Sequence, residues 1–439
     1  MSEQPKGKGG RARVVEANRS QIEWRSFDLD ALIPTDHRAR TIVAAVERFD
    51  LSAFYAGIEA REAEPGRPPF DPKVLLALWL YATSEAVGSA RHLSRLCERD
   101  HAYMWICGGL RPNYHTLADF RGAHDDKLDM LLTQMLAALM TAGAVKLRRV
   151  AQDGTRVRAN AGAASFRRAS TLRERCLQQA KEQVEQLRRE LDEDPAASTA
   201  REAAAQERSA KERLASVERA IAELPKVAGA HERTQQKRAR EAKRKGKVVD
   251  PSKSEPRVST TDPEARVMKM GDGGFRPAYN LQFATDTESR FIVGVDVTNE
   301  GTDKAQMAPM LEQIERRTGQ RPQQCLVDGG YTSIAAIDDA ETRGTEVFGP
   351  VQQQRSPNPH ERKRRDTPRT AAWRARMGSD AAKIIYRQRA AVAETVHADL
   401  RRWRGLGLLP VRGTKKVKAI ALWMALTHNV LRAHALKAS

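Results

Sequence analysis

The spacing of apolar residues changes near Lys146, and this change restricts the chain to two differently built parts. Between residues 22 and 143, apolar side chains recur every three or four positions, which is typical of amphipathic helices. After residue 146, short apolar runs alternate with helical patterns, as in strands joined by helices. The sequence therefore predicts a helical N-terminal part followed by an α/β part with a mixed sheet.

A long insertion interrupts the α/β part early. A strand-like run at residues 147–151 is closed by Asp153-Gly154, and the next strand pattern begins at residue 279. Strands are then predicted at 279–285, 291–297, 324–327 and 345–348, with helices at 303–317, 333–343 and 381–403. This order of strand, insertion, hairpin and alternating helices and strands is compatible with an RNase H-like fold.

The insertion, residues 166–257, carries an apolar seam on an otherwise charged sequence. Apolar residues repeat at helical spacing from Leu177 to Leu191 and again from Leu214 to Leu224, on either side of a break at Asp194-Pro195. The pattern predicts a helical hairpin that closes on itself or pairs with a second subunit. Residues 231–248 carry eight Lys or Arg against two Glu, so we expect a flexible basic segment there.

The charge of the chain favours a polyanionic partner. Lys and Arg outnumber Asp and Glu 75 to 56 in 439 residues, which gives a net charge of +19 and favours binding to nucleic acid. The longest apolar runs are too short to span a bilayer and the first residues lack the apolar stretch of a signal peptide, so we expect no membrane partner. The four cysteines are widely separated, without a CxxC pair, which favours a reducing cytosol and neither a disulfide framework nor a zinc module.

Two short helices are expected within the N-terminal part, at residues 89–97 and 113–121. A loop containing Gly108, Gly109 and Pro112 separates them, which resembles a helix-turn-helix with an extended connection. In that arrangement the groove-facing residues would be Arg111, Asn113 and His115, together with Thr116. An ordinary helical domain with a Gly- and Pro-containing loop is an equal alternative.

Three carboxylates occupy positions in the predicted fold that suit a metal site. Asp153 and Asp328 follow predicted strands, and Glu394 lies in the helix predicted at residues 381–403. Ligands gather outside the carboxyl ends of strands in open α/β sheets, so the two aspartates can converge there and a glutamate on a covering helix can join them. Three carboxylates within about 4 Å repel one another strongly, and divalent cations relieve that repulsion. Each residue alone also has a simpler explanation, as part of a turn or a charged helix face.

Several other residues are expected to be structural or to contact phosphate. Trp403 and Trp423 recur at helical spacing with leucines, so we expect them in the core, and we interpret His397 and His428 as structural histidines. The Tyr279-Asn280 pair is interpreted as packing. Residues 355–376 carry eight Lys or Arg against two acids, which predicts either a solvated loop or a phosphate contact.

Five segments in order resemble the motifs of bacterial insertion-sequence DDE transposases. They are AQDGTRVRANA (151–161), TTDPEARVMK (260–269), GGFRPAYNLQFATD (273–286), CLVDGGYTS (325–333) and YRQRAAVAE (386–394). The resemblance is greatest to the group numbered eleven eighty-two, and residues 67–93 resemble the InsH-type N-terminal domain of such enzymes. It covers most of residues 20–435, and five ordered motifs are far more specific than any one of them.

The resemblance implies a role for several residues. Asp153, Asp328 and Glu394 match the catalytic acids, which in this family hold two Mg²⁺ ions, with Mn²⁺ able to substitute. Tyr386 and Arg389 match the Tyr and Arg that accompany the glutamate and contact DNA phosphate. Where related families have a Lys after the glutamate, this chain has Arg401, which keeps the charge and changes the contact geometry.

The resemblance and the patterns together predict a DNA transposase in four regions. The regions are a disordered basic arm (1–20), a helical DNA-binding domain (21–145), an RNase H-like catalytic domain (146–165 and 258–439) and the inserted hairpin with its basic segment (166–257). We expect it to act in the cytoplasm, associated with the nucleoid, on double-stranded DNA at terminal inverted repeats and target sites, as a homodimer or larger assembly once two ends are synapsed. The alternatives are a catalytically silent DNA-binding repressor derived from a transposase and a metal-dependent RNase H-like nuclease.

Overall fold

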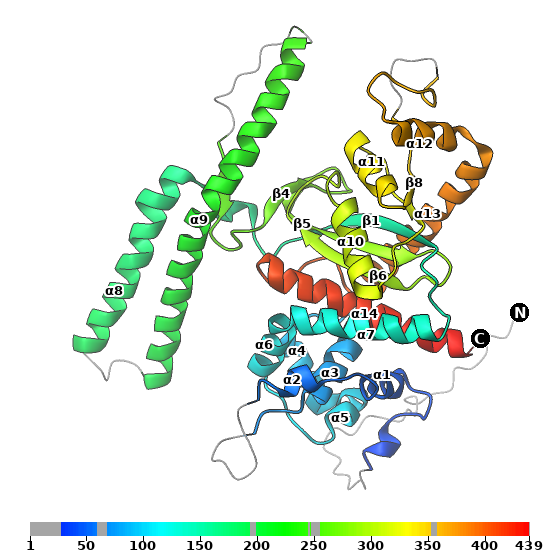
Figure 1. Cartoon of the computed structure of the whole chain (residues 1–439). Helices are drawn as coiled ribbons and strands as arrows, with labels where there is room; N and C mark the ends of the chain where they lie inside the picture. Colours follow the sequence, from blue (N-terminus) through cyan, green and yellow to red (C-terminus); the bar gives the residue numbers. More distant parts are fainter. Residues whose placement is uncertain are drawn as a thin grey trace, which may run out of the picture.

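The computed structural model describes residues 28–58, 68–193, 199–244, 246, 255–352 and 358–438. The basic arm expected at residues 1–20 lies outside these ranges, as does part of the basic segment at 355–376. Figure 1 shows an N-terminal group of helices, a sheet with covering helices and a long helical insertion. None of the helices in the described ranges is long and apolar enough to cross a bilayer.

The N-terminal region is all-helical, as the apolar spacing predicts. Its central helix begins at Pro72, where the Asp71 side chain accepts a hydrogen bond from the backbone N–H of Lys73 and caps the first turn. The connection that we expected to be a loop contains a further helix, capped by Asp100 and ended by Gly108 at φ 55°. The helices are α1 Arg38–Val46, α2 Ser52–Tyr55, α3 Pro72–Ser84, α4 Ala90–Arg99, α5 His101–Cys107, α6 Tyr114–Ala123 and α7 Asp125–Thr141.

A six-stranded mixed sheet forms the second region. Strand β1 pairs antiparallel with β5 and parallel with β7, β8 extends the parallel side, and both β4 and β6 pair antiparallel with β5. The mixed sheet agrees with the sequence prediction. The strands are β1 Arg149–Arg158, β4 Arg266–Lys269, β5 Phe275–Asp286, β6 Ile292–Thr298, β7 Gln324–Leu326 and β8 Glu346–Phe348.

The first strand is longer than the sequence pattern indicated. The prediction that Asp153-Gly154 closes this strand is wrong, because β1 continues to Arg158. Continuous pairing with β5, from Val150 opposite Asp286 to Arg158 opposite Ala278, holds the Asp-Gly step extended. Cross-strand pairing thus overrides the local turn preference. Asp153 lies in the middle of a strand rather than beyond its end.

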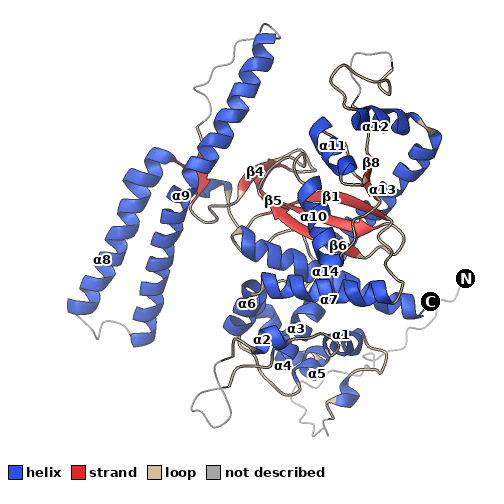
Figure 2. Ribbon diagram, viewed as in Figure 1, coloured by secondary structure: helices blue, strands red, loops and turns tan. Residues whose placement is uncertain are grey.

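Helices cover both faces of the sheet (Figure 2). On one face, Met310 and Ile314 of α10 pack directly over Gly294 of β6. A Cβ at Gly294 would lie 3.2 Å from Ile314 Cγ1, so glycine permits this close packing. The other face receives α13 and α14, as the contact of Phe283 with His397 shows. These helices are α10 Met307–Thr318, α11 Ile334–Thr342, α12 Pro368–Gly378, α13 Asp380–Ala398, followed by a π-helical turn Asp399–Trp403, and α14 Thr414–Ala438.

The insertion consists of α8 Leu177–Glu193 and α9 Ala200–Arg244, which lie side by side in Figure 1. A small sheet of β2 Phe166–Arg168 and β3 Arg257–Ser259 joins its two ends. The expectation of flexible chain from residue 231 is wrong as far as Arg244, because α9 passes through Pro225 and continues to that residue. Residues 245 and 247–254 lie outside the described ranges.

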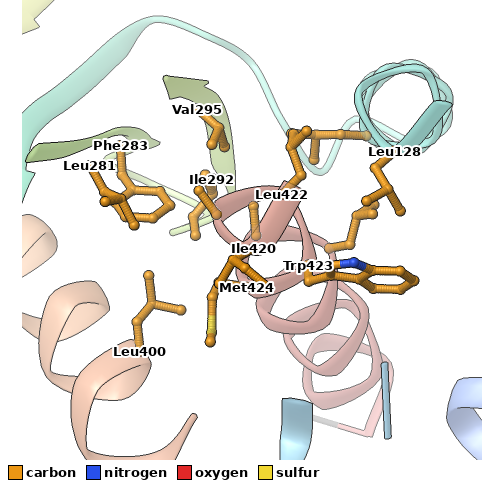
Figure 3. Packing of buried hydrophobic residues seen from close by; sticks show 14 of the residues in the cluster. Leu128, Leu281, Phe283, Ile292, Val295, Leu400, Ile420, Leu422, Trp423 and Met424 are labelled. Carbon is orange, nitrogen blue, oxygen red and sulfur yellow. The ribbon is translucent and has the colours of Figure 1, made fainter. Parts of the chain in front are cut away.

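One apolar core joins the N-terminal helices to the sheet. Figure 3 shows Trp423 and Leu422 of α14 among residues from α7, β5 and β6. Trp423 is 2% exposed, in agreement with the sequence prediction, whereas Trp403 is 63% exposed and its predicted burial is wrong. The π-helical turn that ends α13 breaks the 3.6-residue register on which that prediction depended.

Candidate active site

Asp153 is a partly buried carboxylate in the middle of β1. Its Oδ1 accepts a hydrogen bond of 2.9 Å from the backbone N–H of Gly154, and its Oδ2 lies 3.2 Å from Arg389 Nη1. Burial raises the pKa of Asp153 to about 6; the Arg389 charge opposes this rise, while the nearby carboxylates Asp328 and Asp303 add to it. Asp153 therefore lies in a cluster of like charges with one cation beside it.

Asp328 follows β7 by two residues, as the sequence predicts. Its Oδ1 accepts a hydrogen bond of 2.6 Å from the backbone N–H of Gly330. A Cβ at Gly330 would lie 2.8 Å from the same oxygen, so a side chain there would displace the carboxylate. The Asp-Gly-Gly sequence thus brings backbone close to the Asp328 carboxylate.

Asp303 is a third aspartate near Asp328, and the sequence interpretation missed it by assigning it to a helix. It precedes α10, and its Oδ1 accepts hydrogen bonds from the side-chain amides of Asn280 at 2.7 Å and Gln282 at 2.8 Å. A Cβ at Gly330 would lie 3.4 Å from Asp303 Oδ2, so this oxygen borders the same glycine as Asp328. The available sequence signal for Asp303 was the pair of amides in the predicted strand at 279–285, because buried amides need hydrogen-bond partners. Asn280 and Gln282 are fully buried, so Asn280 does not serve packing alone.

Glu394 lies exposed on α13, between two residues that do contact Asp153. These are Arg389 and His397, whose Nδ1 is 3.9 Å from Asp153 Oδ2. Three residues along an α-helix correspond to about 300° of rotation, which is about 60° short of a full turn. The Glu394 side chain therefore projects from α13 about 60° around the helix from His397 and about 4.5 Å along the axis. Within the described ranges no group of three His, Cys, Asp or Glu side chains is close enough to hold a metal ion, so Glu394 is not joined with Asp153 and Asp328 in one ligand group.

His397 is part of the site rather than a remote structural residue. Burial lowers its pKa to about 4, with the positive charges of Arg401 and Arg389 lowering it further, so the imidazole is neutral near pH 7. His428, by contrast, is structural as expected, because its ring nitrogens lie 3.0 Å from Asp399 Oδ2 and 3.0 Å from the carbonyl oxygen of Arg290.

The residues expected to contact phosphate occupy different environments. Tyr386 is half-buried one turn from Arg389; burial raises its pKa, and the Arg389 charge opposes part of that rise. Arg401 donates hydrogen bonds to Thr155 Oγ1 and to the carbonyl oxygen of Arg156, so it braces β1 in this structure. In the basic segment, Arg374 is buried and pairs with Asp366, which makes it structural.

The three residues expected at the DNA-facing end of the N-terminal region gather at the start of α6. Arg111, Asn113 and His115 are exposed there. The Asn113 side chain accepts a hydrogen bond of 3.0 Å from the backbone N–H of Thr116 and caps α6, so its oxygen is already used. His115 stacks on Tyr114 with ring centroids 3.9 Å apart.

The aspartate cluster suits a divalent cation. Asp153 and Asp328 supply hard oxygen ligands, and the pKa of Asp153 is raised first by burial and further by the neighbouring carboxylates, whose repulsion a bound dication would remove. The close approach of Gly330 to Asp328 leaves the cluster bordered by backbone rather than by a side chain. The donor chemistry thus fits Mg²⁺ or Mn²⁺.

Comparison with known proteins gives two family matches. Residues 242–430 match the family described as the transposase DDE domain, and residues 27–123 match the transposase domain known as DUF772. The first range contains Asp303, Asp328 and Glu394, and it begins after β1 and Asp153. No curated protein and no solved structure matches the chain.

A DDE domain implies an RNase H-like fold, with which the mixed sheet agrees, and divalent metal ions are typical of this family. Together the two matches support a bacterial insertion-sequence DDE transposase.

Proposed function

We propose that this protein binds the terminal inverted repeats of a mobile element, cleaves phosphodiester bonds at its ends and transfers the 3′-hydroxyl ends to target DNA. The observation that carries the proposal is the partly buried Asp153 near Asp328, with its pKa raised by burial and by neighbouring carboxylates. Such a cluster has little structural purpose without a cation, because each ionised neighbour makes burial more costly. A nuclease or strand-transfer enzyme uses such a carboxylate cluster to bind the catalytic cation.

Asp153 and Asp328 are proposed as the two aspartates that hold Mg²⁺ or Mn²⁺, with Glu394 as the third acid. Two such cations, when bound, would activate the attacking oxygen and stabilise the leaving one during in-line displacement at phosphorus. Glu394 is exposed and about 60° around α13 from His397, so a side-chain rotation with a small shift of the helix carries its carboxylate towards Asp153.

The side chains around the aspartates would orient the DNA. Arg389 lies against Asp153, and a cation on that carboxylate would compete with its guanidinium, which could then pair with a phosphate next to the scissile bond. Tyr386 lies on the same face of α13 and would donate a hydrogen bond to the same backbone. Neutral His397 packs against Phe283 and adds no charge that competes with the cation.

The test is metal-dependent nicking of DNA that carries the element ends. Asp328→Asn should reduce Mg²⁺-dependent nicking at least 1,000-fold while leaving binding to the same DNA within about twofold, because an amide keeps the shape and loses the charge that holds the metal. Asp380→Asn, an exposed acid at the start of α13, is the matched control and should nick as the parent does. Retained nicking by Asp328→Asn removes this residue from the mechanism.

The third ligand is decided by two further variants. Glu394→Gln should abolish nicking if this exposed acid completes the site, whereas Asp303→Asn should weaken Mn²⁺ binding, measured by calorimetry, without abolishing it. The reverse pattern, with Asp303 essential and Glu394 dispensable, would identify Asp303 in place of Glu394 as the third acid.

The same assays separate the alternatives. A repressor derived from a transposase would bind the terminal repeats and cleave nothing. A nuclease would cleave but would not join pre-cut ends to target DNA. A transposase must also hold two ends together, so we propose a homodimer or larger assembly on DNA, acting in the cytoplasm at the nucleoid.

A further inference from the structure

We propose that the last fourteen residues of α9 form an arm that binds the phosphate backbone of duplex DNA outside the catalytic centre. We name residues 231–244 the α9 extension. The inference rests on the proposed function in that it takes DNA as the partner, and it adds a contact surface that neither the aspartate cluster nor α6 supplies. Figure 1 shows this part of α9 reaching beyond α8, away from the sheet.

Among the described residues, the α9 extension packs against no apolar core. Leu224 is the last buried residue of α9, and beyond Val227 and Ala228 the helix carries no apolar seam. Isolated helices of this length are marginal in water, and a helix that is polar all round lacks a stabilising face. Contact with a polar partner would supply the stabilisation that this helix lacks by itself.

Charge separates the α9 extension from the rest of the hairpin. Residues 177–193 and 200–230 carry nine Lys or Arg and ten Asp or Glu, which is close to neutral. There the charges pair locally, as in Lys211 with Glu207 and Lys226 with Glu223. The α9 extension carries six Lys or Arg against two Glu, and in the described part of the chain none of the six forms an ion pair. The positive charge of the α9 extension is therefore not neutralised by ion pairs with the described residues.

The basic residues form a row along one side of the helix. Arg233, Lys237, Arg240 and Arg244 follow one another at intervals of four, three and four residues, which places them within about 60° of one another. All four are exposed. Like charges at these intervals destabilise a free helix by a few tenths of a kcal/mol per pair, and neutralisation by a polyanion removes that cost.

Duplex DNA is the partner that fits this row best. The α9 extension is about 21 Å long, which corresponds to about six base pairs. The row itself consists of Arg and Lys, and the α9 extension has no Asn, Phe, Tyr or Trp, so it suits phosphate contacts, which position a protein without reading sequence. We therefore expect binding that is independent of sequence and strongly weakened by salt.

The experiment uses the full-length protein and a 30-base-pair duplex of random sequence. The triple variant Arg233→Gln, Lys237→Gln, Arg240→Gln should lower affinity at least tenfold at 0.1 M salt and reduce the slope of log K against log salt by about 3, since each lost phosphate contact removes about 0.9. Glutamine preserves side-chain length and helix propensity. Circular dichroism checks that the helix content is retained.

The matched control removes three exposed positive charges from the packed part of the hairpin: Lys181→Gln, Arg208→Gln, Arg219→Gln. This variant should keep the slope of the parent. Equal changes in both variants, or no change in either, would overturn the inference, as would a triple variant that only alters the oligomeric state and so indicates a protein partner. Mg²⁺-dependent nicking by the parent is measured in parallel, so that a failed arm with intact nicking leaves the proposed function standing, whereas absent nicking rejects that function by itself.

Discussion

Asp153 gives the clearest prediction from a single ionisable group. Its pKa is raised from 3.8 to about 6 in the fold, so between these values the folded state binds a proton that the unfolded state has lost. Stability therefore falls as pH rises through this window, by on the order of 2–3 kcal/mol when it is complete. In EDTA, Asp153→Asn should be less stable than or equal to the parent near pH 4 and more stable near pH 7, as measured by urea unfolding. A stability difference that does not change with pH would contradict the assigned pKa.

The identity of the site residues was predictable in part from sequence. Asp328 could be predicted because a short apolar strand ends just before it in the sequence. Asp303 and His397 could not, because tertiary contacts position both: two amides of β5 hold Asp303 near Asp328, and the docking of α13 on β1 brings His397 to Asp153. Glu394 came from the resemblance alone, since nothing in its spacing distinguishes it from other charged residues on a helix.

At the level of elements, the Asp153-Gly154 step shows why local sequence can mislead. An Asp-Gly pair favours a turn, but β5 pairs along the whole of β1 and holds it extended. The bounds predicted for β6 and β7, whose sequences are mainly apolar, agree with the structure within one or two residues. The α9 extension was misjudged for the opposite reason, because a charged segment without an apolar face gives no periodic signal even where it is helical.

Gly154 is predicted to be required for the geometry of β1 and β5. A Cβ there would lie 2.6 Å from Asp303 Oδ1 and 2.7 Å from Asn280 Oδ1, so Gly154→Ala must displace the amides that hold Asp303. We expect a loss of stability of about 1–3 kcal/mol and weaker Mn²⁺ binding. Gly162→Ala is the control, since no atom lies within 4 Å of its Cβ position and its φ of −85° suits alanine. Equal unfolding midpoints for the two variants would show that β1 and β5 tolerate a side chain there.

For the whole molecule, α14 makes the N-terminal helices and the sheet one folding unit. Trp423 donates a hydrogen bond from Nε1 to the carbonyl oxygen of Arg121 in α6, and Asn429, less than two turns later, bonds to both backbone groups of Ile292 in β6. Because a single helix supplies core to both regions, separating them would expose it on two sides.

This shared helix predicts that the two regions unfold together. Trp423→Ala should cost about 3–5 kcal/mol, since it removes a fully packed indole and leaves a cavity between α14 and α6. Calorimetry should show one transition for the N-terminal helices and the sheet in both parent and variant, shifted to lower temperature in the variant. A variant in which the sheet melts at the parental temperature while the N-terminal helices melt earlier would show that α14 belongs to the sheet alone. A single transition would instead show that α6 and the strands that carry Asp153 and precede Asp328 unfold as one cooperative unit, because α14 packs against both regions.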